Sequence, residues 1–305
     1  MRSTRHRGFA QMRLQDKVVA ITGSGSGLGR ECALLFANQG AKVITSDFVH
    51  GRAEKVADEV VAAGGEAVGI HADVRVEADM ERLVQVAVDR FGRIDIMFAN
   101  AGIPEPGFGA GVFEELSLDN WNNIIATNLT GIFLAWKHAA KQLIAQGRGG
   151  TLLATTSAAS LNAYPGFPAY TASKAGGNGL VRAAALEWGK YGIRANALAP
   201  THGMSINFAL PPEAEVLGLS YEQMAPWDPD KRAMPLRLDS PPVLRDNAYV
   251  ALFLASDESR YMSGQTLASV DGGNFARTSI ILPSDLGDVG TVLPDELRHV
   301  VDGAS

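Results

Sequence analysis

The chain has 305 residues, of which 46% are hydrophobic, and it carries a formal net charge of −6 at pH 7. This composition suits one large α/β domain, and the mildly acidic balance without a basic stripe excludes nucleic acid as the expected partner. No run approaches the roughly 18 apolar residues of a membrane span, and no secretory signal is evident, so no membrane partner and a cytoplasmic location are expected. The single cysteine, Cys32, is expected to be a small core residue.

The first predicted unit is a strand, a glycine turn and a helix. An apolar, β-branched run at 17–22 predicts a buried parallel strand, and a helical pattern follows at 28–39. Between them stand Gly23, Gly27 and Gly29, spaced G-x-x-x-G-x-G rather than G-x-G-x-x-G. Amides at a helix start face anions, and glycine lets the backbone approach them, so the unit predicts a dinucleotide pyrophosphate site. A flexible Gly/Ser loop is the alternative for the turn alone.

Asp47 follows the second predicted strand, at 41–46, about 20 residues beyond the glycine turn. A carboxylate at this place accepts hydrogen bonds from the adenosine ribose and repels a 2′-phosphate. No Arg or Lys occupies Ser24, Ser26 or Phe48, where a cation would offset that repulsion. The sequence therefore favours NAD over NADP as cofactor, and an ordinary strand-end aspartate is the alternative.

Helix and strand patterns alternate along the rest of the chain. Helices are predicted at 53–63, 77–91, 118–144, 168–190 and 243–256, and strands at 67–72, 94–99, 151–155, 194–198 and 266–270. This alternation predicts an α/β fold, a doubly wound parallel sheet of the Rossmann type. Ligands of such sheets bind outside the carboxyl ends of the strands, where the sequence places Gly23, Asp47, Asp73, Asn100 and Ser157.

One segment interrupts the alternation. Residues 200–242 are rich in Pro, Met, Ser and Asp and are interpreted as a substrate lid, with a disordered loop as the alternative. The lid is expected to belong to a single domain at 14–274. Residues 1–13, which are basic and lack acids, are expected to be a disordered extension, and residues 275–305 a C-terminal tail.

Tyr170 and Lys174 are four residues apart in the helix predicted at 168–190, so they share one face. A nearby ammonium favours the phenolate, and Lys174 is therefore expected to lower the pKa of Tyr170 toward working pH. Ser157, thirteen residues before Tyr170, is expected to hydrogen-bond the reacting oxygen. Together the three side chains predict a proton-transfer site, whereas a Tyr–Lys pair alone is more often a surface helix pair.

Further motifs occur in a fixed order along the chain. They are Thr22–Gly29, Asp73-Val74, Asn100-Ala101-Gly102, Asn128, and the set of Ser157, Tyr170 and Lys174. In this order they resemble the classical short-chain dehydrogenase/reductase family over about residues 12–275. The resemblance implies that Tyr170 is the general acid/base and that Lys174 holds the nicotinamide ribose and lowers the Tyr170 pKa. It further implies that Ser157 orients the substrate oxygen, and that Asn128 maintains a water linking Lys174 to solvent.

The resemblance also implies a set of cofactor contacts and no metal. The set comprises Gly23, Ser26, Gly27, Leu28, Gly29, Asp47, Phe48, Asp73, Val74, Asn100, Ala101, Gly102, Tyr170, Lys174, Pro200 and Ser205. One motif departs from the family pattern P-G-x-x-x-T, because Thr201 replaces its glycine and Ser205 its threonine. His202 in the same segment is interpreted as a pocket or surface histidine rather than a second acid/base.

The expected function is NAD-dependent hydride transfer between the nicotinamide and a secondary alcohol or ketone. Candidate substrate contacts are mostly apolar and favour a cyclic or otherwise hydrophobic alcohol: 104–108, Phe167, His202, Met204, Phe208 and Trp227. The resemblance implies a homotetramer with the helices of Asn128 and Tyr170 at one interface. Two alternatives stay open, namely an NADPH-dependent 3-oxoacyl reductase-like enzyme and a non-catalytic nucleotide-binding sensor or scaffold.

Overall fold

A computed structural model describes residues 12–109, 112–211, 214–231 and 234–276. Seven strands form one parallel sheet in the order β3-β2-β1-β4-β5-β6-β7. Their bounds are β1 Val18–Thr22, β2 Lys42–Asp47, β3 Glu66–His71, β4 Ile96–Ala99, β5 Gly150–Thr155, β6 Ile193–Pro200 and β7 Thr266–Ser269. The strand order reverses between β1 and β4, and this switch point is where a doubly wound sheet opens a crevice at its carboxyl edge.

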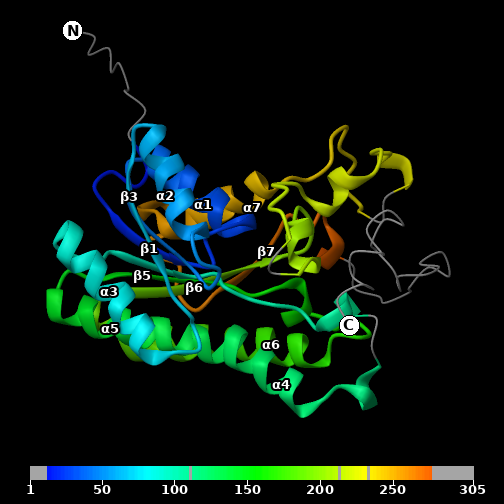
Figure 1. Cartoon of the computed structure of the whole chain (residues 1–305), viewed down its shortest axis with the longest axis horizontal. Helices are drawn as coiled ribbons and strands as arrows, with labels where there is room; N and C mark the ends of the chain where they lie inside the picture. Colours follow the sequence, from blue (N-terminus) through cyan, green and yellow to red (C-terminus); the bar gives the residue numbers. More distant parts are fainter. Residues whose placement is uncertain (1–11, 110–111, 212–213, 232–233, 277–305) are drawn as a thin grey trace, which may run out of the picture.

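Helices cover both faces of the sheet (Figure 1). One layer contains α1 (Gly27–Asn38), α2 (Arg52–Ala62) and α7 (Leu244–Ala255), and the other contains α3 (Glu77–Phe91), α4 (Leu118–Ile125), α5 (Gly131–Gln146) and α6 (Pro168–Trp188). Each layer buries its own apolar cluster against the sheet, around Phe36 and Phe98 on one side and Trp136 on the other. The predicted doubly wound sheet is confirmed, and the predicted element ends lie within two residues of the observed ones.

The helix predicted as continuous at 118–144 contains a break. One π-helical turn at Ala126–Thr130 separates α4 from α5. The turn includes Asn128, whose side chain is fully buried and bonds to the loop after β4 instead of facing solvent. Hydrophobic periodicity cannot reveal such a turn, because one extra residue in the helix barely changes the pattern.

The described part of 200–242 holds only short 3₁₀ turns, at Ile206–Ala209, Tyr221–Met224 and Pro229–Lys231, which confirms the irregular segment. It forms the yellow-green flank beside the carboxyl edge of the sheet (Figure 1). An antiparallel bridge between Ser205 and Ser220 joins two parts of this segment. We refer to its described residues 203–211 and 214–231 as the lid.

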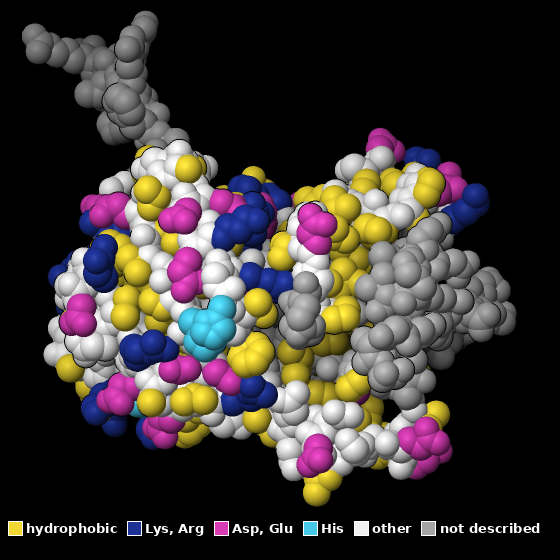
Figure 2. All heavy atoms as spheres, viewed as in Figure 1, with side chains coloured by type: hydrophobic (Ala, Val, Ile, Leu, Met, Phe, Trp, Pro, Cys, Tyr) yellow, Lys and Arg dark blue, Asp and Glu magenta, His cyan; other side chains and the backbone are white. Residues whose placement is uncertain are grey.

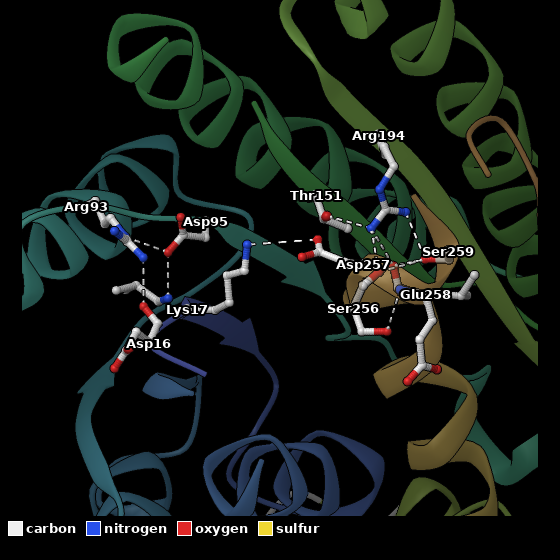
Figure 3. A network of polar contacts seen from close by, with 12 residues as sticks. Asp16, Lys17, Arg93, Asp95, Thr151, Arg194, Ser256, Asp257, Glu258 and Ser259 are labelled. Carbon is white, nitrogen blue, oxygen red and sulfur yellow. Dashed lines mark hydrogen bonds and ion pairs between the residues drawn. The ribbon is translucent and has the colours of Figure 1, made fainter. Parts of the chain in front are cut away.

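The amino edge of the sheet is joined by a polar network (Figure 3). Asp95 Oδ2 accepts hydrogen bonds from the Val18 amide and from Arg93 Nε, both at 2.8 Å. The half-buried Arg194 donates to Thr151 Oγ1 at 3.0 Å and to Ser259 Oγ at 3.0 Å, and also to the backbone carbonyls of Leu254, Ser256 and Met262. Arg194 thereby fastens the segment after α7 to the starts of β5 and β6.

The remaining expectations concern the ends of the chain and its core. Cys32 is fully buried and free, as predicted. The expected disorder at the start of the chain falls largely on 1–11, outside the described residues, and Arg13 is ion-paired with Glu258 at 2.6 Å. Most of the predicted tail, 277–305, also lies outside them. None of the described helices has the length and apolar character that a bilayer crossing requires.

Candidate active site

A cavity of about 920 Å³ lies outside the carboxyl ends of the strands, bounded by the lid. Figure 2 shows the hollow between the body of the domain and the lid, with mostly hydrophobic side chains on its walls. Most of the predicted site residues line it: Gly23, Ser26, Gly27, Leu28, Asp47, Phe48, Asp73, Val74, Asn100, Ala101, Gly102, Tyr170, Lys174 and Ser205. The fold thus brings residues from separate motifs of the chain to one place.

The glycine turn between β1 and α1 is shaped for close approach. Gly23 and Gly27 have φ of 61° and 52°, a region that favours glycine. A Cβ on Gly29 would lie 2.3 Å from the Gly23 carbonyl, so glycine is required there for packing, and Gly29 itself stays behind the cavity wall. Ser26 precedes α1 without a side-chain cap, which leaves the first amides of the helix available to an anion. This turn fits the pyrophosphate of a dinucleotide.

Asp47 lies beside that turn at the end of β2. Its carboxylate accepts hydrogen bonds from the amides of Gly25 and Val49, both at 2.9 Å, and the residue is 9% exposed. Sequence reasoning missed a neighbour, Arg52 at the start of α2. A Cβ on Gly25 would meet both Arg52 Cβ, at 2.5 Å, and Asp47 Oδ2, at 2.7 Å. Arg52 also donates to the lid carbonyl of Ala214 at 2.9 Å, so a cation does stand near the predicted ribose site.

Asp73 and Arg75 form the far end of the cavity. Arg75 donates to both carboxylate oxygens of Asp73, at 2.9 and 2.7 Å, and its guanidinium lies 5.2 Å from the centre of the Phe48 ring. Burial alone would raise the pKa of Asp73, but the hydrogen bonds from Arg75 outweigh it and the pKa is lowered. Val74 presents an apolar side chain beside this ion pair. Phe48 and Val74 make this end of the cavity partly apolar, which suits an adenine base.

Asn100 joins the carboxyl ends of three strands. Its side-chain nitrogen, Nδ2, donates to the carbonyls of Thr22 and Gly23 at 3.2 and 3.1 Å. Its side-chain oxygen accepts a hydrogen bond from Thr155 Oγ1 at 2.9 Å. The Thr22 hydroxyl in turn accepts from the backbone amides of Asn100 and Ala101. The Asn-Ala-Gly motif therefore fixes the glycine turn relative to β5.

Tyr170 and Lys174 lie at the opposite end of the cavity, on α6. Lys174 is 2% exposed, donates to the Thr155 carbonyl at 2.7 Å and sits 5.6 Å from the centre of the Tyr170 ring. Tyr170 is 7% exposed and shares a side-chain hydrogen bond with Ser157. The three side chains of the predicted proton-transfer site are therefore together, although Ser157 is not among the residues that line the cavity.

The pKa values of this pair correct the sequence expectation. Burial raises the pKa of Tyr170 to about 12; the Ser157 hydrogen bond opposes this, and Glu105 and Tyr164 add to it. Burial also lowers the pKa of Lys174 to about 7. The predicted lowering of the Tyr170 pKa by Lys174 is not seen, because burial is the largest influence on the phenol and Lys174 is not among the groups that shift its pKa.

Asn128 holds the loop that follows β4. Its Oδ1 accepts from the Ile103 amide at 2.8 Å, and its Nδ2 donates to the Ile103 carbonyl at 2.9 Å and to Ser173 Oγ at 3.1 Å. A Cβ on Gly102 would meet Lys174 Nζ at 3.0 Å and Asn128 Oδ1 at 3.3 Å, so the two side chains face the same residue. The role in a proton relay that the resemblance implies remains a prediction.

Several predicted contacts lie elsewhere. Of the described cavity walls, none is formed by Asn128, Ser157, Gly29 or Pro200, nor by Phe167, His202 or Trp227. His202 instead bonds to Glu222 at 3.2 Å and to Asn274 at 2.9 Å and anchors the lid. Trp227 donates to the Leu238 carbonyl at 2.8 Å. Thr201 has a buried hydroxyl for which the described residues provide no partner, and Ser205 lies against Gly27 as the motif requires.

An aromatic cluster stands beside Tyr170. Its members are Phe108, Phe167, Phe208 and Tyr221 together with Tyr170 itself, with ring centroids 5.3 to 6.1 Å apart. Phe108 has a φ of 50° and lies between two glycines of positive φ. This backbone conformation is strained for a residue other than glycine, and such strain is found mainly at functional sites. Phe108, Phe208 and Met204 line the cavity. This end of the site is therefore suited to an apolar group next to the phenol.

Further polar wall residues escaped sequence reasoning. Asn120, Asn123 and Thr127 of the α4 region line the cavity, and Asn123 Oδ1 accepts from Arg75 Nη1 at 2.7 Å. Their spacing of three and four residues puts them on one helix face, so a polar stripe could have indicated them. Among the residues that the structure describes, no group of three or more His, Cys, Asp and Glu side chains could hold a metal ion.

Comparisons with known proteins agree with this geometry. The sequence profile of the short chain dehydrogenase family matches residues 17–205. Short-chain dehydrogenase reductase 3a of Arabidopsis thaliana is 37% identical over 263 residues, which cover 86% of this chain and 96% of that protein. Cyclohexanol dehydrogenase of an Acinetobacter species is 36% identical over 261 residues, covering 85% and 95%. The structure of levodione reductase superposes with a TM-score of 0.73 at 33% identity and covers 87% of this chain and 99% of that one.

Proposed function

This chain belongs to the short-chain dehydrogenase/reductase family of oxidoreductases, and from that premise we propose that it is an NAD-dependent dehydrogenase of hydrophobic secondary alcohols. The observation that carries the proposal is the cavity itself. It joins the glycine turn and Asp47 at one end to Tyr170, Lys174 and the aromatic cluster at the other. A dinucleotide laid along it would bring its nicotinamide to the phenol.

In the proposed oxidation, Tyr170 is the base that takes the hydroxyl proton. The bound nicotinamide supplies the hydride acceptor. Ser157 stabilises the Tyr170 oxygen through their hydrogen bond, and the Thr155 carbonyl fixes Lys174 below the phenol ring. Protonated Lys174 favours the phenolate, and its pKa of about 7 lets it exchange a proton near neutral pH. A positioned base of this kind contributes about 10²–10⁴-fold to the rate.

Asp47 supports the choice of NAD. It is nearly buried at the end of β2, within the part of the cavity that the glycine turn assigns to the adenosine. A carboxylate there accepts hydrogen bonds from both ribose hydroxyls, whereas a 2′-phosphate would meet its negative charge.

The substrate class follows from the opposite end of the cavity. Phe108 and Phe208 of the aromatic cluster line the cavity together with Met204, and the Phe208 ring lies 5.6 Å from the Tyr170 ring. A relative in the comparisons is named for cyclohexanol, an alicyclic alcohol. We therefore place alicyclic secondary alcohols first among the substrates to be tested.

The test is a steady-state assay of the purified protein with cyclohexanol and with linear secondary alcohols, each with NAD⁺ and with NADP⁺. Turnover with NAD⁺ and preference for the ring alcohol are expected. Asp47→Ser should reduce the preference for NAD⁺ about tenfold or more, because a charge-assisted hydrogen bond contributes about 1.5–3 kcal/mol. Asp58→Ser, the same change at an exposed site of α2, is the matched control. A wild type that uses only NADP⁺ contradicts the cofactor assignment.

One observation favours a second candidate, an NADPH-dependent reductase. Arg52 and Arg75 line the same part of the cavity as Asp47. Both are engaged with protein groups, Arg75 with Asp73 and Arg52 with the lid, so a 2′-phosphate would have to compete with these contacts. Loss of NADPH binding in Arg52→Met without loss of NADH binding would show that Arg52 holds the 2′-phosphate and would favour the reductase.

We also propose that the protein assembles as a homotetramer through the α4–α6 side. Phe133 on α5 and Leu186 on α6 are 49% and 87% exposed, and burying their apolar surface between subunits would be favourable. Sedimentation at micromolar concentration is the measurement, and a monomer would contradict the proposal.

A further inference from the structure

Glu105 is a buried carboxylate in the loop after β4, three residues beyond the Asn-Ala-Gly motif. It is 4% exposed and belongs to no motif that identified the family. Burying a carboxylate is costly unless it is paired, and no ion pair to Glu105 occurs within the described part of the chain. A residue kept at this cost needs an explanation in terms of what it contacts.

Its first carboxylate oxygen, Oε1, accepts a hydrogen bond from the backbone amide of Tyr170 at 2.8 Å. The Ala169 amide also bonds to this carboxylate. Helix α6 begins Pro168-Ala169-Tyr170, and Phe167 before it offers no side-chain cap. Since Pro168 has no amide hydrogen, Glu105 satisfies the first two free donors of the helix. A short polar residue at position 167 would cap the helix without a buried charge, so capping alone does not explain Glu105.

The other side of Tyr170 is held from the same loop. Ser173 Oγ donates to the Tyr170 carbonyl at 2.7 Å and accepts from Asn128 Nδ2 at 3.1 Å. Asn128 in turn bonds to both backbone groups of Ile103. The segment 103–105 is therefore linked to both backbone groups of Tyr170. Glu105 binds the amide directly, and Ile103 is connected to the carbonyl through Asn128 and Ser173.

The second oxygen, Oε2, is buried and has no hydrogen-bond partner among the residues described. Burial raises the pKa of Glu105, while the backbone hydrogen bonds act in the opposite direction. When the group is ionised, its charge faces Tyr170 and raises the phenol pKa. The other titratable groups around the phenol are Tyr164 before α6, Tyr221 of the lid and Lys174 on α6 itself.

We propose that Glu105 is a positioning residue for Tyr170: it fixes the backbone of the proton-transfer residue from the substrate loop and places a carboxylate against it. The proposal rests on the proposed function, in which Tyr170 is the acid/base. Because the same loop carries Phe108 of the aromatic cluster, a shift of this loop would move the substrate wall and Tyr170 together.

The contact is tested first by amide hydrogen exchange of the peptide spanning 168–174. In Glu105→Ala the first amides of α6 lose their acceptor, and exchange at Ala169 and Tyr170 should accelerate about tenfold or more. Glu105→Gln keeps an acceptor oxygen and should exchange within about threefold of the wild type. Glu114→Gln, an exposed residue of a nearby segment, is the matched control and should change nothing. Unchanged exchange in Glu105→Ala overturns the proposal.

The consequence is tested by kinetics on the same variants. Glu105→Ala should lower kcat about tenfold or more with the dissociation constant of NADH within threefold, because a misplaced base costs rate rather than cofactor affinity. Oxidation needs the phenolate, and Glu105→Gln removes a negative charge beside it. The ascending limb of its kcat/KM profile should therefore move to lower pH, by about half a unit or more.

Two results overturn the proposal at this stage. One is a kcat/KM profile of Glu105→Gln whose ascending limb lies at the same pH as in the wild type. This measurement can be made even if Glu105→Ala does not fold. The other is an equal loss of kcat and of NADH affinity in Glu105→Ala, which would indicate general damage to the site. A wild type that oxidises no alcohol with either cofactor contradicts the proposed function instead, and amide exchange then still decides whether Glu105 holds Tyr170.

Discussion

Both edges of the sheet carry many polar groups, but the two edges differ in whether these groups have hydrogen-bond partners within the protein. At the amino edge, Asp95, Arg93 and Arg194 find their partners within the protein, across β1, β4, β5, β6 and the segment after α7 (Figure 3). The residues that the structure describes contain five buried side-chain atoms without a partner, and all lie toward the carboxyl edge: in Glu105, Thr171, Thr201, Asn207 and Tyr221.

We infer from this difference that the amino edge contributes mainly to stability and the carboxyl edge mainly to function. A satisfied polar network in a low-dielectric setting makes an edge rigid, whereas unsatisfied groups around a cavity cost stability. Groups of that second kind persist when a ligand or a reaction uses them. The comparison predicts that substitutions at the carboxyl edge change catalysis with little effect on folding, except at the buried Lys174, and that those at the amino edge do the reverse.

Tyr170→Phe should give the largest effect. Loss of the phenol oxygen removes the base, and kcat for alcohol oxidation should fall about 10²–10⁴-fold, while NADH binds within about threefold of the wild type. Tyr261→Phe, at a side chain that is 91% exposed, is the control. If Tyr170→Phe kept its activity, Tyr170 would not be the base of the reaction.

Arg194→Met tests the amino edge. The substitution leaves several buried acceptors without a hydrogen-bond donor, and it should therefore lower the free energy of unfolding by about 2–3 kcal/mol. The values of kcat and of NADH affinity should stay within about twofold of the wild type. Urea denaturation measures the first quantity, and Arg148→Met, at an exposed site, is the control. A drop in kcat at unchanged stability would mean that the two edges are not separable in this way.

Lys174→Met should reveal the cost of the buried ammonium as a pH dependence of stability. The pKa of Lys174 is about 7 in the folded protein and 10.5 in the free side chain. Between these values the unfolded chain binds more protons, so wild-type stability relative to Lys174→Met should rise with pH from about 7 to 10, by up to about 1.4 kcal/mol per pH unit. Tyr170, whose raised pKa lowers stability above pH 10, is present in both proteins, so its contribution cancels in this difference. Lys141→Met is the exposed control, and parallel curves for wild type and Lys174→Met would contradict the burial argument.

Phe208→Ala should have the smallest of these effects. It removes one wall of the cavity beside Tyr170 and should lower kcat/KM for cyclohexanol about tenfold, with a smaller loss for a linear secondary alcohol. Phe113→Ala, at a side chain that is 74% exposed, is the control. An equal loss for both alcohols would mean that Phe208 does not read the shape of the substrate.

The fold and much of the site could be predicted because their signals are local. The alternating patterns indicate a parallel sheet, and a parallel sheet brings its strand ends to one edge, so Gly23, Asp47 and Asn100 had to meet. The Tyr170–Lys174 pair was visible because four residues make one helical turn. These predictions needed only spacing along the chain and the rules of strand connection.

What escaped prediction depends on contacts between distant residues or on burial. The bond from Glu105 to the Tyr170 amide spans 65 residues, and Arg52 reaches the lid across 162. No local pattern encodes either contact. The predicted direction of the Tyr170 pKa was wrong because burial raises this pKa, and the sequence does not show how deeply the phenol is buried. His202 and Trp227 looked like pocket residues by type, yet their partners in the lid and beyond it place them elsewhere.

The most direct test of the central claim is amide hydrogen exchange of the whole protein with and without NADH. Binding at the carboxyl edge should slow exchange in 22–29, 47–52, 100–105 and 203–211. The amino-edge segments 93–96, 193–196 and 254–259 should be unchanged, because their groups already have partners. Equal exchange in both samples, or protection confined to the amino edge, would contradict the assignment of the cavity as a nicotinamide dinucleotide site.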